Sequence, residues 1–200
     1  GSRPLRFETS QDIGSLLPEW PVDHCIKALC FYHPDDSEEL KREQQEKLRG
    51  LFEAARKVGR ELLIEIIASK NGPLGADTIS RALEEIYALG IKPDWWKLEP
   101  QSSPAAWAAI EKTIAKHDPW CRGVLLLGLD APAEELEAGF AATAAAPIVK
   151  GFAVGRTIFM SAAEGWLSGK LDDEAAIADM ARRFEALTGL WLATRGRKAA

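Results

Sequence analysis

Short apolar runs alternate along the chain with longer segments of helical periodicity. Six runs are predicted to be strands: Leu5–Glu8, Cys25–Tyr32, Leu62–Ile67, Asp94–Leu98, Gly123–Gly128 and Val149–Val154. Helices are predicted over residues 12–20, 36–58, 77–90, 103–118, the alanine-rich stretch capped by Asp130, 158–166 and 173–193. Because most of these strands are apolar without alternation, the pattern indicates a parallel sheet covered by helices.

The spacing of the strands, about 25 to 40 residues, is that of consecutive βαβ units. Such alternation fits either a (β/α)8 TIM barrel or an open doubly wound sheet. No Gly-x-Gly-x-x-Gly motif follows any strand, and unusual polar residues are spread over several strands, which favours the barrel. The sequence therefore predicts one α/β domain over residues 1–200, a TIM barrel that lacks two of its eight strands.

Composition and charge argue against several classes of function. The 200 residues carry a net charge of -5, so nucleic acid is not an expected partner. No apolar stretch approaches the roughly 20 residues that span a bilayer, so no membrane contact is expected. Three cysteines without metal-type spacing indicate reduced thiols and a cytoplasmic protein. The three histidines form no zinc motif, so neither a metal nor a cofactor is predicted.

Charged residues interrupt three of the apolar strands. Lys27, Glu65 and Lys97 each lie within a different one, and a buried charge is costly unless it is paired or neutralised. Alternate side chains of a strand share a face. If these residues face inward, they meet in one cavity near the carboxyl ends of neighbouring strands, where sites on barrels lie. Glu99 shares the face of Lys97 and is assigned to substrate binding.

A class I aldolase requires such a set of side chains. A neutral lysine attacks a ketone to form an iminium, and a carboxyl group moves protons. A second lysine keeps the first from holding its proton and binds a substrate hydroxyl. In this interpretation Lys97 is the nucleophile, Glu65 transfers protons and Lys27 is the second lysine. The alternative from spacing alone is a structural Lys–Glu ion pair, or lysines whose amines reach the strand ends.

The last two strands provide a candidate phosphate site. One ends at Gly128, and the other continues into Gly155-Arg156-Thr157 before a helix. In barrels the loops after the last strands and a helix N-terminus commonly hold phosphate. Glycines let backbone N–H groups approach the anion, and Arg156 can bind it through two N–H groups. A tight turn with a surface arginine is the alternative. His33 follows a strand end and either lines the mouth of the cavity or belongs to a loop.

Four segments carry a family resemblance: residues 27–35, 63–67, 94–100 and 151–159. They resemble the aldolase-like domain fused behind the sugar kinase in bacterial 5-dehydro-2-deoxygluconokinase, a protein of myo-inositol catabolism. Within these segments, the Trp-Trp-Lys and Val-Gly-Arg-Thr-Ile-Phe motifs are the ones specific to this family. More distantly the chain is similar to class I tagatose-1,6-bisphosphate aldolase. This likeness implies that Lys97 is the Schiff-base lysine, Glu65 the acid–base carboxylate, Lys27 the second lysine and Arg156 the phosphate ligand.

The resemblance also implies a reaction and partner proteins. It points to cleavage of 2-deoxy-5-keto-gluconate 6-phosphate into dihydroxyacetone phosphate and malonate semialdehyde. An N-terminal sugar kinase and a homo-oligomer are the expected protein partners. Leu5–Glu8 would be the third strand, so the first two strands and an aspartate that helps cleavage are missing. The shortened chain is therefore expected to be a partial barrel that can be inactive in isolation. The competing hypothesis is a non-catalytic sugar-phosphate-binding or assembly domain of the kinase.

Overall fold

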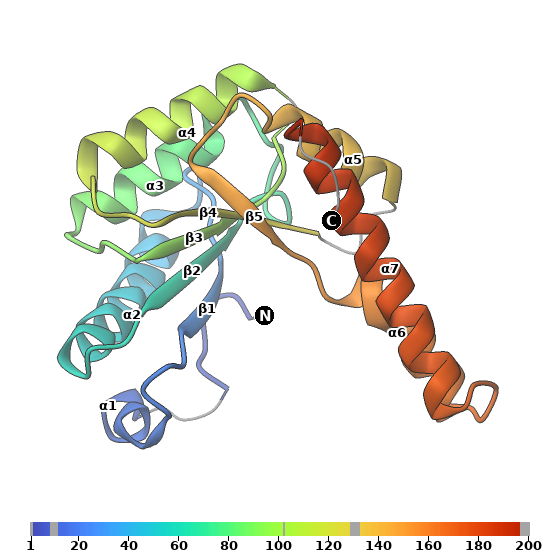
Figure 1. Cartoon of the computed structure of the whole chain (residues 1–200). Coiled ribbons are helices and arrows are strands. Elements are labelled where there is room, and N and C mark those ends of the chain that lie inside the picture. The colour runs from blue at the N-terminus through green and yellow to red at the C-terminus, as the bar shows by residue number, and fades with distance from the viewer. Residues whose placement is uncertain (1, 9–11, 102, 129–132, 197–200) are drawn as a thin grey trace.

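The computed structural model describes residues 2–8, 12–101, 103–128 and 133–196. Its strands are β1 (Ile26–Phe31), β2 (Leu62–Ile67), β3 (Trp95–Leu98), β4 (Gly123–Leu127) and β5 (Val149–Ala153). Its helices are α1 (Ile13–Leu16), the 3-10 turn η1 (Leu17–Glu19), α2 (Glu38–Lys57), α3 (Thr78–Ala88), α4 (Pro104–His117), α5 (Ala133–Ala142), α6 (Arg156–Leu167) and α7 (Asp173–Thr194). Helices and strands therefore alternate as the hydrophobic pattern predicts (Figure 1).

The five described strands form one parallel sheet in the order β1-β2-β3-β4-β5. Helices α2, α3 and α4 pack along one side of it (Figure 1). Ile64, Trp96 and Val124 point to that side and are fully buried. The opposite side, which corresponds to the interior of a barrel, is only partly covered, and Lys27 on it is exposed. One face of the sheet thus forms the core, and the other is available for a site.

Asp94 fixes the start of β3 relative to β2. Its Oδ2 accepts a hydrogen bond from the backbone N–H of Leu62 at 2.8 Å and another from Nη1 of Arg56 on α2, also at 2.8 Å. The backbone O of Asp94 in turn accepts from Arg122 N–H at 2.8 Å, just before β4. These bonds hold three consecutive strands in register at the end of the sheet opposite the site, so the polar side chains further along each strand meet at fixed positions.

The predicted strand at Leu5–Glu8 is wrong. Residues 5–8 are irregular, and the first strand of the sheet is β1. Leu5 is buried in the core, but a cavity lies between this segment and β1. The segment therefore packs through a side chain and makes no ladder of backbone hydrogen bonds, which a strand requires. Five strands are described where six were expected.

The remaining differences concern element ends. Helix α6 begins at Arg156, two residues before the predicted start, so Arg156 lies in its first turn. The predicted cap Asp130 lies outside the described residues. Within the described ranges, no helix is both long enough and apolar enough to span a lipid bilayer.

Candidate active site

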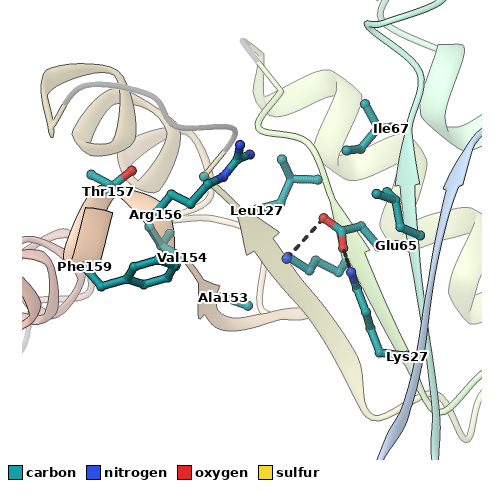
Figure 2. A pocket seen from close by; sticks show the side chains of 13 residues that line it. Lys27, Glu65, Ile67, Leu127, Ala153, Val154, Arg156, Thr157 and Phe159 are labelled. Atoms are coloured by element: carbon teal, nitrogen blue, oxygen red, sulfur yellow. Dashed lines mark ion pairs between the residues drawn. The ribbon is translucent and has the colours of Figure 1, made fainter. Parts of the chain in front are cut away.

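Three charged side chains meet on the open face of the sheet (Figure 2). Glu65 Oε1 lies 3.1 Å from Nζ of Lys97, and Glu65 Oε2 lies 2.6 Å from Nζ of Lys27. One carboxylate therefore bridges two amines from the strands on either side of it. The strand pattern predicts that these three side chains converge, and the structure confirms that geometry.

Strand register places the three residues. Glu65 is paired directly with Lys97 on β3 and with Leu29 on β1. In a parallel sheet paired residues project to the same side, so Glu65 and Lys97 are immediate neighbours. Lys27 lies two residues before Leu29 on that same side and reaches Glu65 diagonally. A shift of one residue in either pairing would turn a charged side chain into the apolar core.

Burial differs sharply within the trio. The Glu65 side chain is 7% exposed, that of Lys97 18% and that of Lys27 45%. A carboxylate in such a position is stable as an anion only with close cations, and here it has one on each oxygen. A single ammonium suffices to balance its charge. The trio therefore places a carboxylate that can exchange protons directly beside two primary amines, the set of groups that nucleophilic catalysis by a lysine uses.

The trio forms one wall of a cavity of about 330 Å³. The ends of β4 and β5 and the first turn of α6 form the other wall, through Leu127, Gly128, residues 153–157 and Phe159. Volumes of this size are at the low end of small-ligand sites. The cavity lies at the carboxyl ends of the strands, as sites on barrel folds do.

Arg156, Gly155 and Gly128 all line this cavity. In Figure 2 the Arg156 side chain extends from the start of α6 toward the end of β4 beside Leu127. Gly155 is the N-cap of α6, and its carbonyl accepts from the N–H groups of Ile158 and Phe159 at 2.8 and 3.1 Å. The helix dipole and the guanidinium therefore place positive potential on this wall.

Gly128 has a steric role in the same wall. A Cβ atom at this position would lie 2.9 Å from Cγ2 of Val154, closer than carbon atoms pack. The absence of a side chain lets the end of β4 approach the segment after β5. Because of this close approach, Leu127 and Arg156 line the same cavity.

His33 and Glu99 were assigned to the site, and the structure places both elsewhere. The His33 ring is buried in the loop after β1, where Nδ1 accepts from Asp35 N–H at 3.2 Å and Nε2 lies 3.3 Å from Pro73 O. These hydrogen bonds fix the loop that follows β1. His33 therefore belongs to a loop, which is the second of the two alternatives given for it. Glu99 lies beyond the last residue of β3, and its carboxylate accepts from the backbone N–H groups of Ala68 and Ser69 at 2.7 and 3.1 Å. It therefore ties the end of β3 to the end of β2.

Several residues that line the cavity are not predicted by the sequence pattern. Ile67, Leu127 and Phe159 are apolar and line the same space as the charged trio. The i, i+2 alternation from Glu65 to Ile67 and from Lys27 to Leu29 was a signal for the strand residues. Phe159 had no such signal, because its position depends on where α6 begins. Within the described residues, no three His, Cys, Asp or Glu side chains are grouped to hold a metal ion.

Comparisons with known proteins give a fold and a family. The solved structure of Plasmodium falciparum fructose-bisphosphate aldolase, in a ternary complex with TRAP and a small-molecule inhibitor, is similar with a TM-score of 0.60 and 13% identity. The similarity covers 88% of this chain and 58% of that one, so this chain spans less than two thirds of the length of the aldolase. The likeness confirms the predicted α/β fold, a partial (β/α)8 barrel.

No curated protein matches the sequence. Residues 1–195 match the family DUF2090, described as an uncharacterized protein conserved in bacteria. The match covers nearly the whole chain. The chain therefore belongs to the DUF2090 family.

Proposed function

We propose that this domain is a class I, Schiff-base carbon–carbon lyase that acts on a phosphorylated keto sugar acid. The observation that carries the proposal is the Glu65 carboxylate held 3.1 Å from the Lys97 amine and 2.6 Å from the Lys27 amine at the wall of a cavity. A structural ion pair needs only two partners. A third charged group at the same carboxylate, beside an empty volume, favours chemistry over structure.

Lys97 is the nucleophile in this mechanism. Its side chain is the less exposed of the two, and its amine lies 3.1 Å from Glu65 Oε1, within reach of direct proton transfer. Its amine adds to the substrate ketone to give a carbinolamine. Glu65 takes the proton that the Lys97 ammonium gives up before its amine attacks, and passes it to the carbinolamine hydroxyl, which leaves as water and yields the iminium.

The iminium then accepts the electrons of the breaking bond. In 2-deoxy-5-keto-gluconate 6-phosphate the iminium forms at C5, and the C3–C4 bond breaks as the C3 hydroxyl gives its proton to the Glu65 carboxylate. The products are malonate semialdehyde and the enamine of dihydroxyacetone phosphate. Glu65 then returns the proton to C4 of the enamine, and addition of water to the resulting iminium releases dihydroxyacetone phosphate and regenerates Lys97. Lys27, with its amine at the opposite oxygen of Glu65, hydrogen-bonds a substrate hydroxyl.

Arg156 is the proposed phosphate ligand. Replacing it with glutamine is expected to weaken binding of a phosphorylated ligand by about 10- to 100-fold, because a charge-assisted bidentate contact is lost. Titration calorimetry with dihydroxyacetone phosphate measures this change. Arg182→Gln, which removes an exposed charge on α7, is the matched control and should bind as the unmodified chain does. Equal affinity in both variants would refute the assignment.

Trapping of the covalent intermediate tests the proposal most directly. Borohydride reduction in the presence of dihydroxyacetone phosphate should add the mass of one reduced ketose phosphate, and peptide mapping should place it on Lys97. Lys150 on β5 is exposed and bonds only to the carbonyl of Pro147 among described residues, so it serves as an internal control that stays unmodified. The proposal is wrong if a chain that contains all eight barrel strands gives no adduct.

One observation favours a second candidate, a non-catalytic assembly domain of a fused sugar kinase. Trp166, Ile177 and Phe184 on α6 and α7 are exposed by 51%, 62% and 53%, respectively. Large apolar side chains grouped on one helical pair are typical of an interaction surface. Trapping separates the two candidates, because an assembly domain has no need of a nucleophilic amine.

A further inference from the structure

The backbone ladder between β2 and β3 ends just past the two residues that carry the proposed chemistry. Glu65 is paired with Lys97, and Ile66 with Leu98 is the last pair of that ladder. Terminal pairs of a ladder open more readily than central ones. The 3.1 Å separation between Glu65 Oε1 and Lys97 Nζ is therefore set one residue from the point where backbone pairing stops. A further bond between the two strand ends would keep this separation fixed.

The Glu99 side chain provides such bonds. Its carboxylate accepts from the backbone N–H groups of Ala68 and Ser69 at 2.7 and 3.1 Å, and from the Ser69 hydroxyl. Gln101 Nε2 donates to the backbone carbonyl of Glu99 at 2.8 Å and fixes the segment from which the carboxylate extends. One side chain of β3's extension therefore takes over the connection to β2 where the backbone ladder ends.

An ionised group is more than a structural connection requires. Glu99 is 1% exposed, and burial of a carboxylate is unfavourable. Among the described residues, no ion pair involves it. A glutamine could accept from the same backbone N–H groups without that penalty, but hydrogen bonds to a carboxylate are shorter and about twice as strong. The charged side chain therefore favours a rigid junction at the expense of stability.

The loop after β2 is also held on its other side. The buried His33 ring, in the loop after β1, has its Nε2 atom 3.3 Å from Pro73 O. A Cβ atom at Gly72 would lie 3.0 Å from the same nitrogen, so the two loops are in close contact. With Glu99 on the β3 side, β2 is held from both sides at its carboxyl end, and β2 is the strand that carries Glu65.

We propose that Glu99 is a positioning residue, which acts through Glu65 by fixing that carboxylate at proton-transfer distance from the Lys97 amine. The inference rests on the proposed function, because the proposed reaction moves a proton between these two groups. A displacement of about 1 Å between reacting groups can cost about 100-fold in rate. A loosened junction should therefore slow iminium formation. It should leave binding of phosphate to Arg156, on the opposite wall of the cavity, unchanged.

Glu99→Met removes all three hydrogen bonds of the carboxylate, whereas Glu99→Gln keeps an acceptor for the backbone N–H groups. In a chain that contains all eight barrel strands, borohydride trapping with dihydroxyacetone phosphate measures the rate of adduct formation at Lys97. This rate should fall about 100-fold in Glu99→Met and less than about tenfold in Glu99→Gln. Ser69→Ala removes one of the three bonds and should slow trapping about fivefold, so it carries the test if Glu99→Met does not fold. Binding of glycerol 3-phosphate, which has no ketone, should be the same in every variant by titration calorimetry.

A second measurement reports position without catalysis. The NMR chemical shift of the Lys97 Nζ atom, assigned with Lys97→Arg, is sensitive to the placement of the Glu65 carboxylate. It should move in Glu99→Met and Ser69→Ala and stay close to its original value in Glu99→Gln. Asp118→Ala is the matched control, because Asp118 is 6% exposed and accepts from Trp120 N–H at 3.2 Å at the other end of the sheet. This variant should lower the Tm and leave both the trapping rate and the shift unchanged.

Three results would overturn the inference. The first is an unchanged trapping rate and Lys97 shift in Glu99→Met or, if that variant does not fold, in Ser69→Ala. The second is slowing by Asp118→Ala to the same extent, which would show a general loss of stability. The third is an equal loss in Glu99→Gln and Glu99→Met, which would show that charge matters and the hydrogen bonds to β2 do not. Absence of any adduct in the unmodified chain would instead refute the proposed function, and the chemical shifts would still show whether Glu99 fixes this pair.

Discussion

Replacing Lys97 with methionine is expected to lower kcat for carbon–carbon cleavage by about a thousandfold or more, because no iminium can form without its amine. Methionine is close to lysine in length and carries no charge, so the cavity keeps its shape. Glu65 keeps the Lys27 amine at 2.6 Å and is not left as an unpaired buried anion. The measurement is the steady-state release of dihydroxyacetone phosphate, on a chain that contains the complete barrel.

Two companion variants separate nucleophilicity from charge. Lys97→Arg keeps a cation beside Glu65 but cannot form a Schiff base, so it should be as inactive as Lys97→Met. Lys27→Met should still give a borohydride adduct at Lys97, with turnover reduced about 10- to 100-fold through loss of one hydrogen bond to substrate. Substantial turnover in Lys97→Arg would contradict the mechanism, since it would show that charge alone is required.

Trp96→Ala is expected to reduce the free energy of unfolding by about 3–5 kcal/mol, the usual cost of deleting a buried aromatic side chain. Trp96 lies on β3 immediately before Lys97 and is fully buried on the helix-covered side of the sheet. Its ring contacts Tyr87 of α3 edge to face, with centroids 5.5 Å apart, and its Nε1–H donates to Tyr87 Oη at 2.7 Å. Burial raises the pKa of the Tyr87 phenol, so that partner stays protonated at neutral pH.

Urea denaturation measures this loss, and Trp120→Ala is the matched control. Trp120 is 88% exposed, so its removal should change stability by less than about 0.5 kcal/mol. Tyr87→Phe isolates the hydrogen bond and should cost about 1–2 kcal/mol, because the Trp96 N–H is left buried without its acceptor. Equal effects of Trp96→Ala and Trp120→Ala would show that β3 is not anchored through this ring.

The order of strands and helices was predictable because buried strands of a parallel sheet are apolar on both faces and stand out from helical periodicity. The charged trio was predictable for the same reason. A lysine or glutamate inside such a run is an exception that the period-two geometry of a strand places on a definite side. Glu65 and Lys97 face each other in the register because each lies near the middle of its run.

The incorrect predictions concern residues outside the regular strands, where the two-residue alternation of side chains and the strand register no longer apply. His33 and Glu99 lie past strand ends, and their positions are set by hydrogen bonds to backbone groups of other loops. The sequence carries no sign of those partners. Leu5–Glu8 has an alternating pattern that suits a strand, but a strand also needs backbone pairing, and a cavity separates this segment from the edge of β1.

The distribution of roles along the sheet has an evolutionary consequence. The amines and carboxylate come from β1, β2 and β3, whereas the wall that contains Arg156 comes from the end of β4 and the segment from β5 into α6. Under the proposed function, substitutions in the second half of the chain would alter ligand binding without displacing Lys27, Glu65 or Lys97. Ligand preference and reaction type could then evolve separately in proteins with this arrangement.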